Sequence, residues 1–376
     1  MPSAPGPGPD PVPTQEPGLH LARADDRTAA IDALAALVGG RTGLRPLLDD
    51  LDRHARRTLA PGRAVHRAMT WDREDRRTPW WWPQGISTSA DASATEEVEG
   101  RRLAVVTWYA KPRPGGPRDE APGSRISLVD LDRRRYRHVL LVVPELADDG
   151  TLRLSPLRVH AGGVVWCGGW LHLAATGGGL VTCHVDDLMR VPDRAAGSPA
   201  RLGVDGGRVS THGYRYVLPL RLAYRAHTEA GREPLRYSFL SLDREPSPPE
   251  LVVGEYARGT QTRRLARFPL DPDGLLLAED DAGRCVPRLL GEGVRQTQGA
   301  AVAGGSYFLT TSHGPRTPGS VHVGTPGAPG GFRRHRWATP MGPEDLAYWP
   351  SQDLLWSVSE HPGRRWVFAM RRSRLV

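Results

Sequence analysis

The stretch QGAAVAGGSYFLTTSHGPRTPGSVHVG, residues 298–324, has an apolar opening after a turn, followed by two alternating strands with small residues between them. A degenerate version of this unit recurs five times between Gln84 and Arg371. One twisted sheet alone cannot bury both of its faces, and radial stacking of such units covers them, as in β-propellers. We therefore predict an all-β fold, a five-bladed β-propeller, with six blades as the alternative.

The five units share an opening and a pair of strands. The openings are Gln84-Gly85-Ile86, His160-Ala161-Gly162-Gly163, residues 235–242 after His212-Gly213, Gln298-Gly299-Ala300, and Pro343-Glu344-Asp345-Leu346. The predicted strand pairs are 103–109 with 126–131, 171–176 with 180–185, 251–256 with 264–270, 307–312 with 321–324, and 354–359 with 366–370. Residues 136–143 add a fourth strand to the first unit, and 64–71 are expected to close the last one. The run 214–224 fits an outer strand, an insertion or part of a sixth blade.

The chain before the propeller divides into two parts. Residues 1–20 are rich in Pro, Gly and small polar types and are predicted to be a disordered tail. Over residues 21–62 we expect a helical hairpin, with one helix that ends at Gly39-Gly40 and a second from Leu44 to Leu59. The propeller then spans residues 63–376.

Composition narrows the class of protein. The 376 residues include 43 Gly and 35 Pro, which suits many short strands. The formal charge is +8, but Lys111 is the only lysine and the arginines are spread among Asp and Glu, so nucleic acid and membrane partners are not expected. Cys167, Cys183 and Cys285 are expected to be buried thiols, with a Cys167–Cys183 bridge as the alternative. Residues 1–17 lack a secretory signal, which predicts a cytoplasmic protein unless a leader has been removed.

Polar residues beside the glycines of the openings are the main candidates for chemistry, because propeller ligands bind where the innermost strands meet. We predict that His160, His212, Glu344 and Asp345 are catalytic, since imidazole titrates near neutrality and burial can raise a carboxyl pKa. Gln84 and Gln298 would orient the ligand. The structural alternative is that these side chains cap backbone groups.

A second ring of candidates lies at the ends of the second strands and is expected to share one rim. It consists of Trp108 and Tyr109, Glu255 and Tyr256, Ser312 and His313, and Glu360 and His361. Trp80, Trp81 and Trp82 precede the first blade and are either core or a stacking surface. Since three consecutive residues cannot all face inward, at least one is expected to be exposed or to face the channel, and Trp82 is the predicted ligand contact.

Several familiar motifs are missing from the sequence. There is no GxSxG, P-loop, GxGxxG, HExxH or EF-hand pattern, so we predict no metal and no cofactor. Five-bladed glycosidases place three carboxylates on successive inner strands. Only Asp91, Glu255, Glu344 and Asp345 could be mapped in that way, which argues against such a glycosidase.

The segments Trp82 to Ser89, His160 to Gly163, Gly342 to Leu346 and Ser359 to Arg365 are similar to an actinobacterial family of proteins labelled only as secreted or hypothetical. The resemblance spans about 80–371 and implies a propeller, but no substrate. The chain departs from that family in its helical front end and in the missing export signal.

The predicted function is binding of a small organic molecule in the central funnel and its conversion by cofactor-independent acid and base chemistry, of lyase, isomerase or cyclase type, in specialised metabolism. The alternative is a non-catalytic propeller module that binds a carbohydrate or a protein partner.

Overall fold

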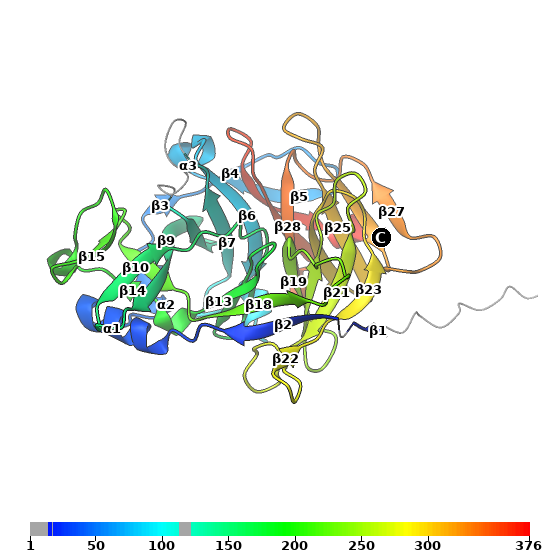
Figure 1. Ribbon diagram of the computed structural model, residues 1–376. Helices are drawn as coiled ribbons and strands as arrows, with labels where there is room; N and C mark the ends of the chain where they lie inside the picture. The colour runs from blue at the N-terminus through cyan, green and yellow to red at the C-terminus, as the bar shows by residue number, and fades with distance from the viewer. Residues whose placement is uncertain (1–13, 17, 113–121) are drawn as a thin grey trace, which may run out of the picture.

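Short strands joined by glycine and proline turns form a ring of sheets in the computed structural model, which describes residues 14–16, 18–112 and 122–376 (Figure 1). The first sheet runs outward through β6 (Trp81–Thr88), β7 (Leu103–Ala110), β8 (Ser124–Asp130), β9 (Arg135–Leu146), β17 (Tyr216–Pro219) and β14 (Met189–Arg190), and β10 (Leu152–Pro156) and β3 (Arg53–His54) also pair with β9. The second runs through β11 (Val164–Cys167), β12 (Trp170–Ala174), β13 (Gly179–His184), β18 (Leu222–Thr228), β2 (Leu19–Ala24) and β22 (Arg284–Cys285).

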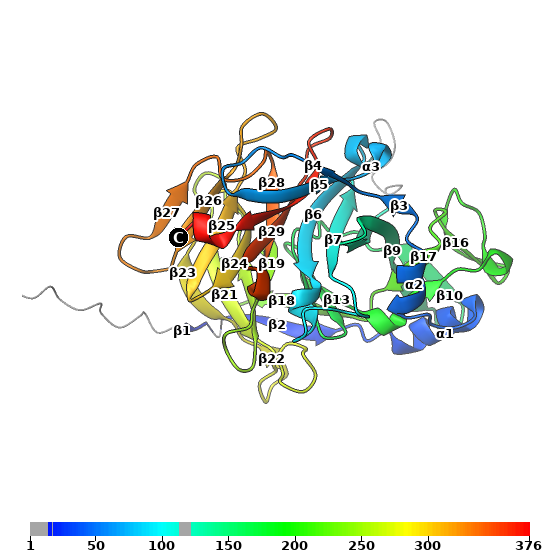
Figure 2. The ribbon, with the colours of Figure 1, turned by 180° about the vertical axis from the view of Figure 1, so that it is seen from behind.

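Three further sheets complete the ring. The third contains β19 (Phe239–Asp243), β20 (Glu250–Gly254), β21 (Arg264–Pro269), β23 (Arg288–Glu292) and β1 (Thr14–Gln15). The fourth contains β24 (Thr297–Ala303), β25 (Ser306–Thr311), β26 (Ser320–Gly324) and β27 (Phe332–His335). The last contains β28 (Pro343–Trp349), β29 (Leu354–Ser359), β30 (Trp366–Arg371), β5 (Val65–Thr70) and β4 (Arg56–Thr58). A separate hairpin, β15 (Leu202–Asp205) with β16 (Arg208–Thr211), lies at the periphery beside β10 (Figure 2).

The innermost strands define the centre of the propeller. Strands β6, β11, β19, β24 and β28 each end one sheet, and each contacts the next in ring order, with β28 returning to β6. Four sheets among the described residues take their first four strands in chain order, so blades of this kind number four, which differs from the five predicted. The remaining sheet is composite: β30 near the C-terminus pairs with β5, with Phe368 opposite Ala68. This pairing confirms the prediction that 64–71 closes the last unit.

Glycines allow the inner strands to approach one another closely. A Cβ on Gly163 would lie 2.1 Å from the backbone nitrogen of Leu240 in β19, and one on Gly299 would lie 2.3 Å from the Cα of Asp345 in β28. Such distances are far inside van der Waals contact, so a side chain at either position would push two sheets apart. The glycines of the predicted openings therefore serve the packing around the axis.

The predicted strand pairs are confirmed in all five units. The run 214–224 belongs to two outer strands: β17 pairs with β9, and β18 pairs with β13. All three cysteines are buried and free, which confirms the buried thiols.

The front end differs from the prediction. Residues 14–15 and 19–20 form strands rather than a disordered tail, and 21–24 form a strand rather than part of the helical hairpin, because β1 and β2 extend the third and second sheets. Residues 1–13 and 17 lie outside the described part of the chain. Helix α1 (Thr28–Val38) ends at Gly39 in the left-handed conformation, as expected. The second helix is only α2 (Leu44–Asp49), since Arg53–His54 and Arg56–Thr58 pair with β9 and β5 instead of continuing it.

Apolar residues from both faces of each sheet fill the spaces between sheets. The buried side of α1, including Ile31 and Leu34, packs against Leu140 and Val142 of β9. The helical front end therefore covers the outer part of the first sheet, away from the axis (Figure 1). None of the described helices has the length and apolar character needed to cross a bilayer.

Candidate functional site

A funnel of about 820 Å³ opens where the inner strands meet. Its inner ring takes one polar side chain from the opening of each sheet: Gln84, His160, Ser238, Gln298 and Glu344. Its second ring lies at the ends of the second strands: Tyr109, Thr176, Tyr256, Glu360 and His361. The circular arrangement thus brings together residues that are separated by as much as the length of the repeat region, as the sequence predicted.

Irregular strand register aims three inner side chains at the funnel. The pairing shifts between Pro83 and Ile86 in β6, between Thr297 and Gly299 in β24, and between Pro343 and Leu346 in β28. A bulge adds a residue to one strand and turns the local side chains away from strict alternation. Gln84, Gln298 and Glu344 are the residues within these three shifts.

Two carboxyls lie in the funnel beside two amides. Gln298 Nε2 donates to Glu344 Oε1 at 3.4 Å, and Gln84 Nε2 donates to Glu360 Oε2 at 3.4 Å. Glu344 is 3% exposed, and burial, with the charges of Glu360 and Asp345, raises its pKa well above the usual range. Burial also raises the pKa of Glu360, although the neighbouring Lys111 opposes this. Burial in the funnel therefore favours the protonated form of Glu344.

An imidazole and aromatic side chains line the same funnel as these carboxyls. His160 stacks at a tilt on Tyr109, with ring centroids 4.6 Å apart. Solvent reaches its ring, yet the surrounding wall and the charge of Lys111 lower the pKa of His160, so the imidazole is neutral at neutral pH. Trp82 meets His361 edge to face, with centroids 6.0 Å apart. Since Trp82 lines the funnel, the expectation that one of the three tryptophans faces the channel is confirmed.

Two of the four predicted catalytic residues lie elsewhere. His212 follows β16 at the periphery, because 214–224 supplies outer strands to the first and second sheets and does not lead into the third. The third opening is instead formed by Ser238. Asp345 is fully buried and does not line the funnel; its Oδ2 accepts from the backbone N–H groups of Ile86 at 3.3 Å and Val164 at 3.2 Å. It joins β28 to the first two sheets.

Three predicted ligand contacts are also structural. Trp108 is buried and donates from Nε1 to Ser127 Oγ at 2.7 Å. Glu255 is ion-paired with Arg264 at 2.8 Å. His313 contacts Ser320 Oγ at 3.0 Å, outside the funnel. Of the four carboxylates that could be mapped to a glycosidase pattern, Asp91, Glu255, Glu344 and Asp345, only Glu344 lines the funnel.

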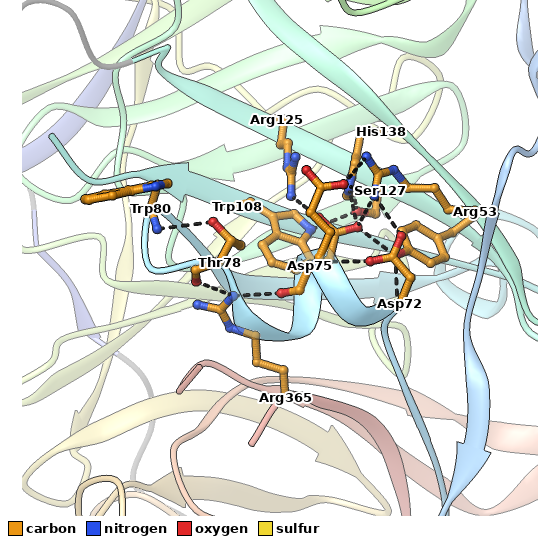
Figure 3. A network of polar contacts seen from close by, with 12 residues as sticks. Arg53, Asp72, Asp75, Thr78, Trp80, Trp108, Arg125, Ser127, His138 and Arg365 are labelled. Atoms are coloured by element: carbon orange, nitrogen blue, oxygen red, sulfur yellow. Dashed lines mark hydrogen bonds and ion pairs between the residues drawn. The ribbon is translucent and has the colours of Figure 1, made fainter. Parts of the chain in front are cut away.

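In a buried network next to the funnel, a serine contacts a histidine, and this histidine contacts an aspartate (Figure 3). Ser127 Oγ lies 2.8 Å from His138 Nδ1, and His138 Nε2 lies 2.8 Å from Asp75 Oδ2. A serine, histidine and aspartate connected in this way resemble the catalytic triad of a hydrolase. However, Ser127 is fully buried, and its hydroxyl oxygen already accepts a hydrogen bond from Trp108 Nε1. No reacting group could reach it, so the network is structural.

Sequence reasoning missed the cationic part of the funnel. Lys111, Arg236 and Arg258 line it, and Lys111 Nζ lies 3.2 Å from the centroid of the Trp82 ring. Lys111 was visible in the sequence as the single lysine, but its position just beyond the first unit's second strand was not used. Within the described residues no group of three His, Cys, Asp or Glu side chains is placed to hold a metal ion.

The topology and the funnel define the chain as an all-β propeller. No protein-family model matches the sequence, and no curated protein matches it. The resemblance to an actinobacterial family, the location in the cell and the partners therefore remain predictions.

Solved structures with a similar arrangement include a gluconolactonase from Xanthomonas campestris, with 12% identity over 85% of this chain and 87% of that one and a TM-score of 0.36. Others are a GH43_1 enzyme from Xanthomonas citri (10% identity, 82% and 90% covered, TM-score 0.38) and the Dos1 propeller (10% identity, 74% and 70% covered, TM-score 0.29). At these values they say nothing about activity.

Proposed function

We propose that the protein is a propeller enzyme that converts a small organic molecule in the funnel by acid and base chemistry, of lyase, isomerase or cyclase type. The observation that carries the proposal is that one funnel holds a carboxyl, Glu344, whose pKa burial raises well above its usual range, and an imidazole, His160, whose pKa is lowered. Two groups whose environments hold them in opposite proton states at one pH can give and take a proton in the same turnover.

The roles follow from the surroundings. His160, open to solvent and free of a carboxylate partner among the described residues, accepts a proton from the ligand. Glu344, buried beside Gln298, donates one to the opposite part of the ligand. Gln84 and Gln298 offer amide groups that orient carbonyl or hydroxyl oxygens. Tyr109 and Trp82 give flat surfaces on which the ligand packs.

The composite sheet also bears on the number of blades. We propose that it acts as the fifth blade, since β28 contacts both β24 and β6 and Glu344 supplies its share of the inner ring. An experimental structure in which β5 separates from β30 would overturn this.

The alternative function is a binding module, and the aromatic side of the funnel favours it. Trp82, Tyr109 and Tyr256 line one cavity together with Lys111. Aromatic faces of this kind hold sugars or other flat ligands without any chemistry.

Proton exchange distinguishes the two functions. Hydroxy acids, hydroxy ketones and unsaturated acids are incubated with the protein in D₂O, and deuterium uptake and product formation are followed by NMR. For a compound that is converted, Glu344→Gln and His160→Phe are expected to lower turnover by about a hundredfold or more while affinity changes less than about tenfold. His212→Asn, outside the funnel, is the matched control and retains activity. If both funnel variants lose affinity and no compound is converted, the binding module is the correct function.

A further inference from the structure

The chain has 50 lysine and arginine residues, of which only Lys111 is a lysine, and this residue lines the funnel. It directly follows Ala110, the end of β7, and its backbone N–H donates to the carbonyl of Trp80 at 2.7 Å. The backbone is thus fixed at a point from which the side chain reaches the cavity. An ammonium differs from a guanidinium as a compact charge with three donors.

The ammonium of Lys111 has aromatic neighbours but no ion pair within 4.0 Å among the described residues. Its Nζ lies 3.2 Å from the Trp82 ring centroid and 5.9 Å from that of Tyr109, and cation–π attraction favours the charged form. Burial lowers the pKa of Lys111, and the nearby charge of Glu360 opposes this. In the described part of the chain, no carboxylate lies within 4.0 Å of this nitrogen and no hydrogen-bond acceptor is paired with it. Its three donors are left for water or for a ligand.

Arg258 is a second cation of the funnel that has no carboxylate partner among the described residues. Arg258 lies on the exposed rim and donates from Nε to the Tyr256 hydroxyl at 3.0 Å, with no carboxylate partner among the described residues. Arg236, by contrast, is paired with Glu233 at 3.3 Å and Glu255 at 3.8 Å. Lys111 and Arg258 are therefore the two cations of the funnel lining that have no ion pair within 4.0 Å among the described residues.

We propose that Lys111 binds the carboxylate of a small organic acid, with Arg258 adding positive charge elsewhere in the lining of the same funnel, and that the uncharged part of this acid extends along the aromatic wall toward Glu344 and Gln298. The inference rests on the proposed function for the place of the ligand, but not for its conversion. It names the substrate class as monocarboxylic acids with a polar group some distance from the carboxylate.

The carboxyl groups of the funnel disfavour ligands that carry more than one negative charge. Glu360 and Glu344 lie in the same cavity, and any negative charge on them repels a second negative charge nearby. A singly charged carboxylate is repelled less by these carboxyls than a dianionic phosphate is. Phosphate therefore serves as a probe that should bind more weakly.

A chain with one lysine permits a direct measurement. Reductive methylation with ¹³C-formaldehyde labels only Lys111 and the N-terminal amine, and dimethyl-lysine keeps its charge. We expect 4-hydroxybenzoate and galacturonate to shift the Lys111 methyl signal and to raise the Tm of the unlabelled protein, whereas 4-hydroxybenzamide, methyl galactoside and inorganic phosphate have at least about tenfold lower affinity. Equal binding by the amide and the acid, or no shift with either acid at near-saturating solubility, would overturn the proposal.

Variants separate a charge contact from packing. Lys111→Met should lower the affinity for both acids by about tenfold and leave that for the neutral probes unchanged, while Lys111→Arg keeps the charge and restores most of it. Arg57→Met, outside the funnel, is the control and should bind as the wild type does. If Lys111→Met weakens acid and amide alike, the lysine acts only in packing. If acids bind through Lys111 but no compound exchanges protons in D₂O, the inference stands and the proposed enzyme activity fails.

Discussion

Glu344 and Asp345 are neighbours in the sequence, yet they act in different places. Glu344 faces the funnel beside Gln298, whereas Asp345 accepts two backbone N–H groups between the sheets. Burial raises the pKa of both carboxyls well above the usual range. Successive side chains of a strand point in opposite directions, so one acidic residue of β28 lines the funnel and the next joins neighbouring sheets.

The raised pKa of Glu344 predicts a pH dependence of stability. The folded chain binds this proton more tightly than the unfolded chain, so the contribution of Glu344 is fully present below the unfolded value of 4.5 and is lost as the pH rises through the raised folded value. Glu344→Gln stays neutral at every pH. We therefore expect the Tm of Glu344→Gln to increase relative to that of the wild type as the pH is raised above about 4.5.

Thermal unfolding from pH 4 to pH 9 checks this expectation, with the exposed Glu97→Gln as the control. A constant difference in Tm between Glu344→Gln and the wild type over the whole range would show that Glu344 ionises normally in the folded protein.

At the scale of elements, the short helix α3 (Arg73–Arg77) is held by one buried carboxylate. Asp75 accepts from the Tyr136 hydroxyl at 2.6 Å and from Arg125 at 2.8 Å, and His138 and Arg53 also contact it (Figure 3). Burial alone would raise the pKa of Asp75, but the effect of these neighbours is larger and lowers the pKa well below the usual range. Arg365, just before β30, donates to the carbonyl of Asp75 at 2.7 Å. The helix thus joins the first sheet to the composite sheet.

Asp75→Asn is expected to lower the free energy of unfolding by about 3–5 kcal/mol, because it leaves the buried guanidinium of Arg125 without its counter-charge. Urea unfolding at neutral pH measures this. The depressed pKa also gives the direction of the pH dependence. The stabilisation by Asp75 is complete above 3.8, the pKa of this carboxyl in the unfolded chain, and is lost as the pH falls below that value.

Glu74→Gln is the matched control, since Glu74 also pairs with Arg53 but its side chain is 76% exposed. It should cost less than about 1 kcal/mol. Equal losses in Asp75→Asn and Glu74→Gln would mean that the buried network does not hold α3.

At the scale of the whole molecule, closure of the ring depends on close approach at the axis. Gly163 lies against β19 and Gly299 against β28, where backbone atoms leave no room for a Cβ. The pairing of β5 with β30 joins the two ends of the propeller and removes an open edge. The funnel exists only while these contacts keep all the sheets in register around it.

Gly163→Ala is expected to cost about 1–3 kcal/mol or more, since the added methyl would overlap the backbone of Phe239 and Leu240. Gly177→Ala is the control, because no atom lies within 4 Å of its added methyl. The measurement is the free energy of unfolding in urea. Unchanged stability in Gly163→Ala would show that the sheets are not tightly packed at this point.

The local sequence pattern predicted the strands of the propeller well but the helical front end poorly. Strands β7, β12, β20, β25 and β29 follow from alternation and turn residues. The apolar spacing from Leu44 to Leu59 is equally compatible with a helix, yet Arg56–Thr58 pairs with β5, because the edge of the composite sheet satisfies its backbone groups. Sheet edges formed by distant residues are invisible in a short window of sequence.

Among the site residues, Gln84, His160, Gln298 and Glu344 were predictable because each stands within two residues of a glycine at a repeat opening. His212 beside Gly213 shows the same local pattern but lies at the periphery, since the strands between it and β19 belong to other sheets. Lys111 and Arg258 carry no repeat signal at all.

The sequence by itself determined the class of fold and four of the five inner-ring residues, all except Ser238, because strand alternation and glycine positions are local properties that repeat along the chain. Only the tertiary structure decided which polar residues face the funnel and which hold the sheets together. The physical reason is that burial, strand register and the closing of the ring are set by contacts between distant residues, and these contacts give Glu344 and Asp345 their different roles.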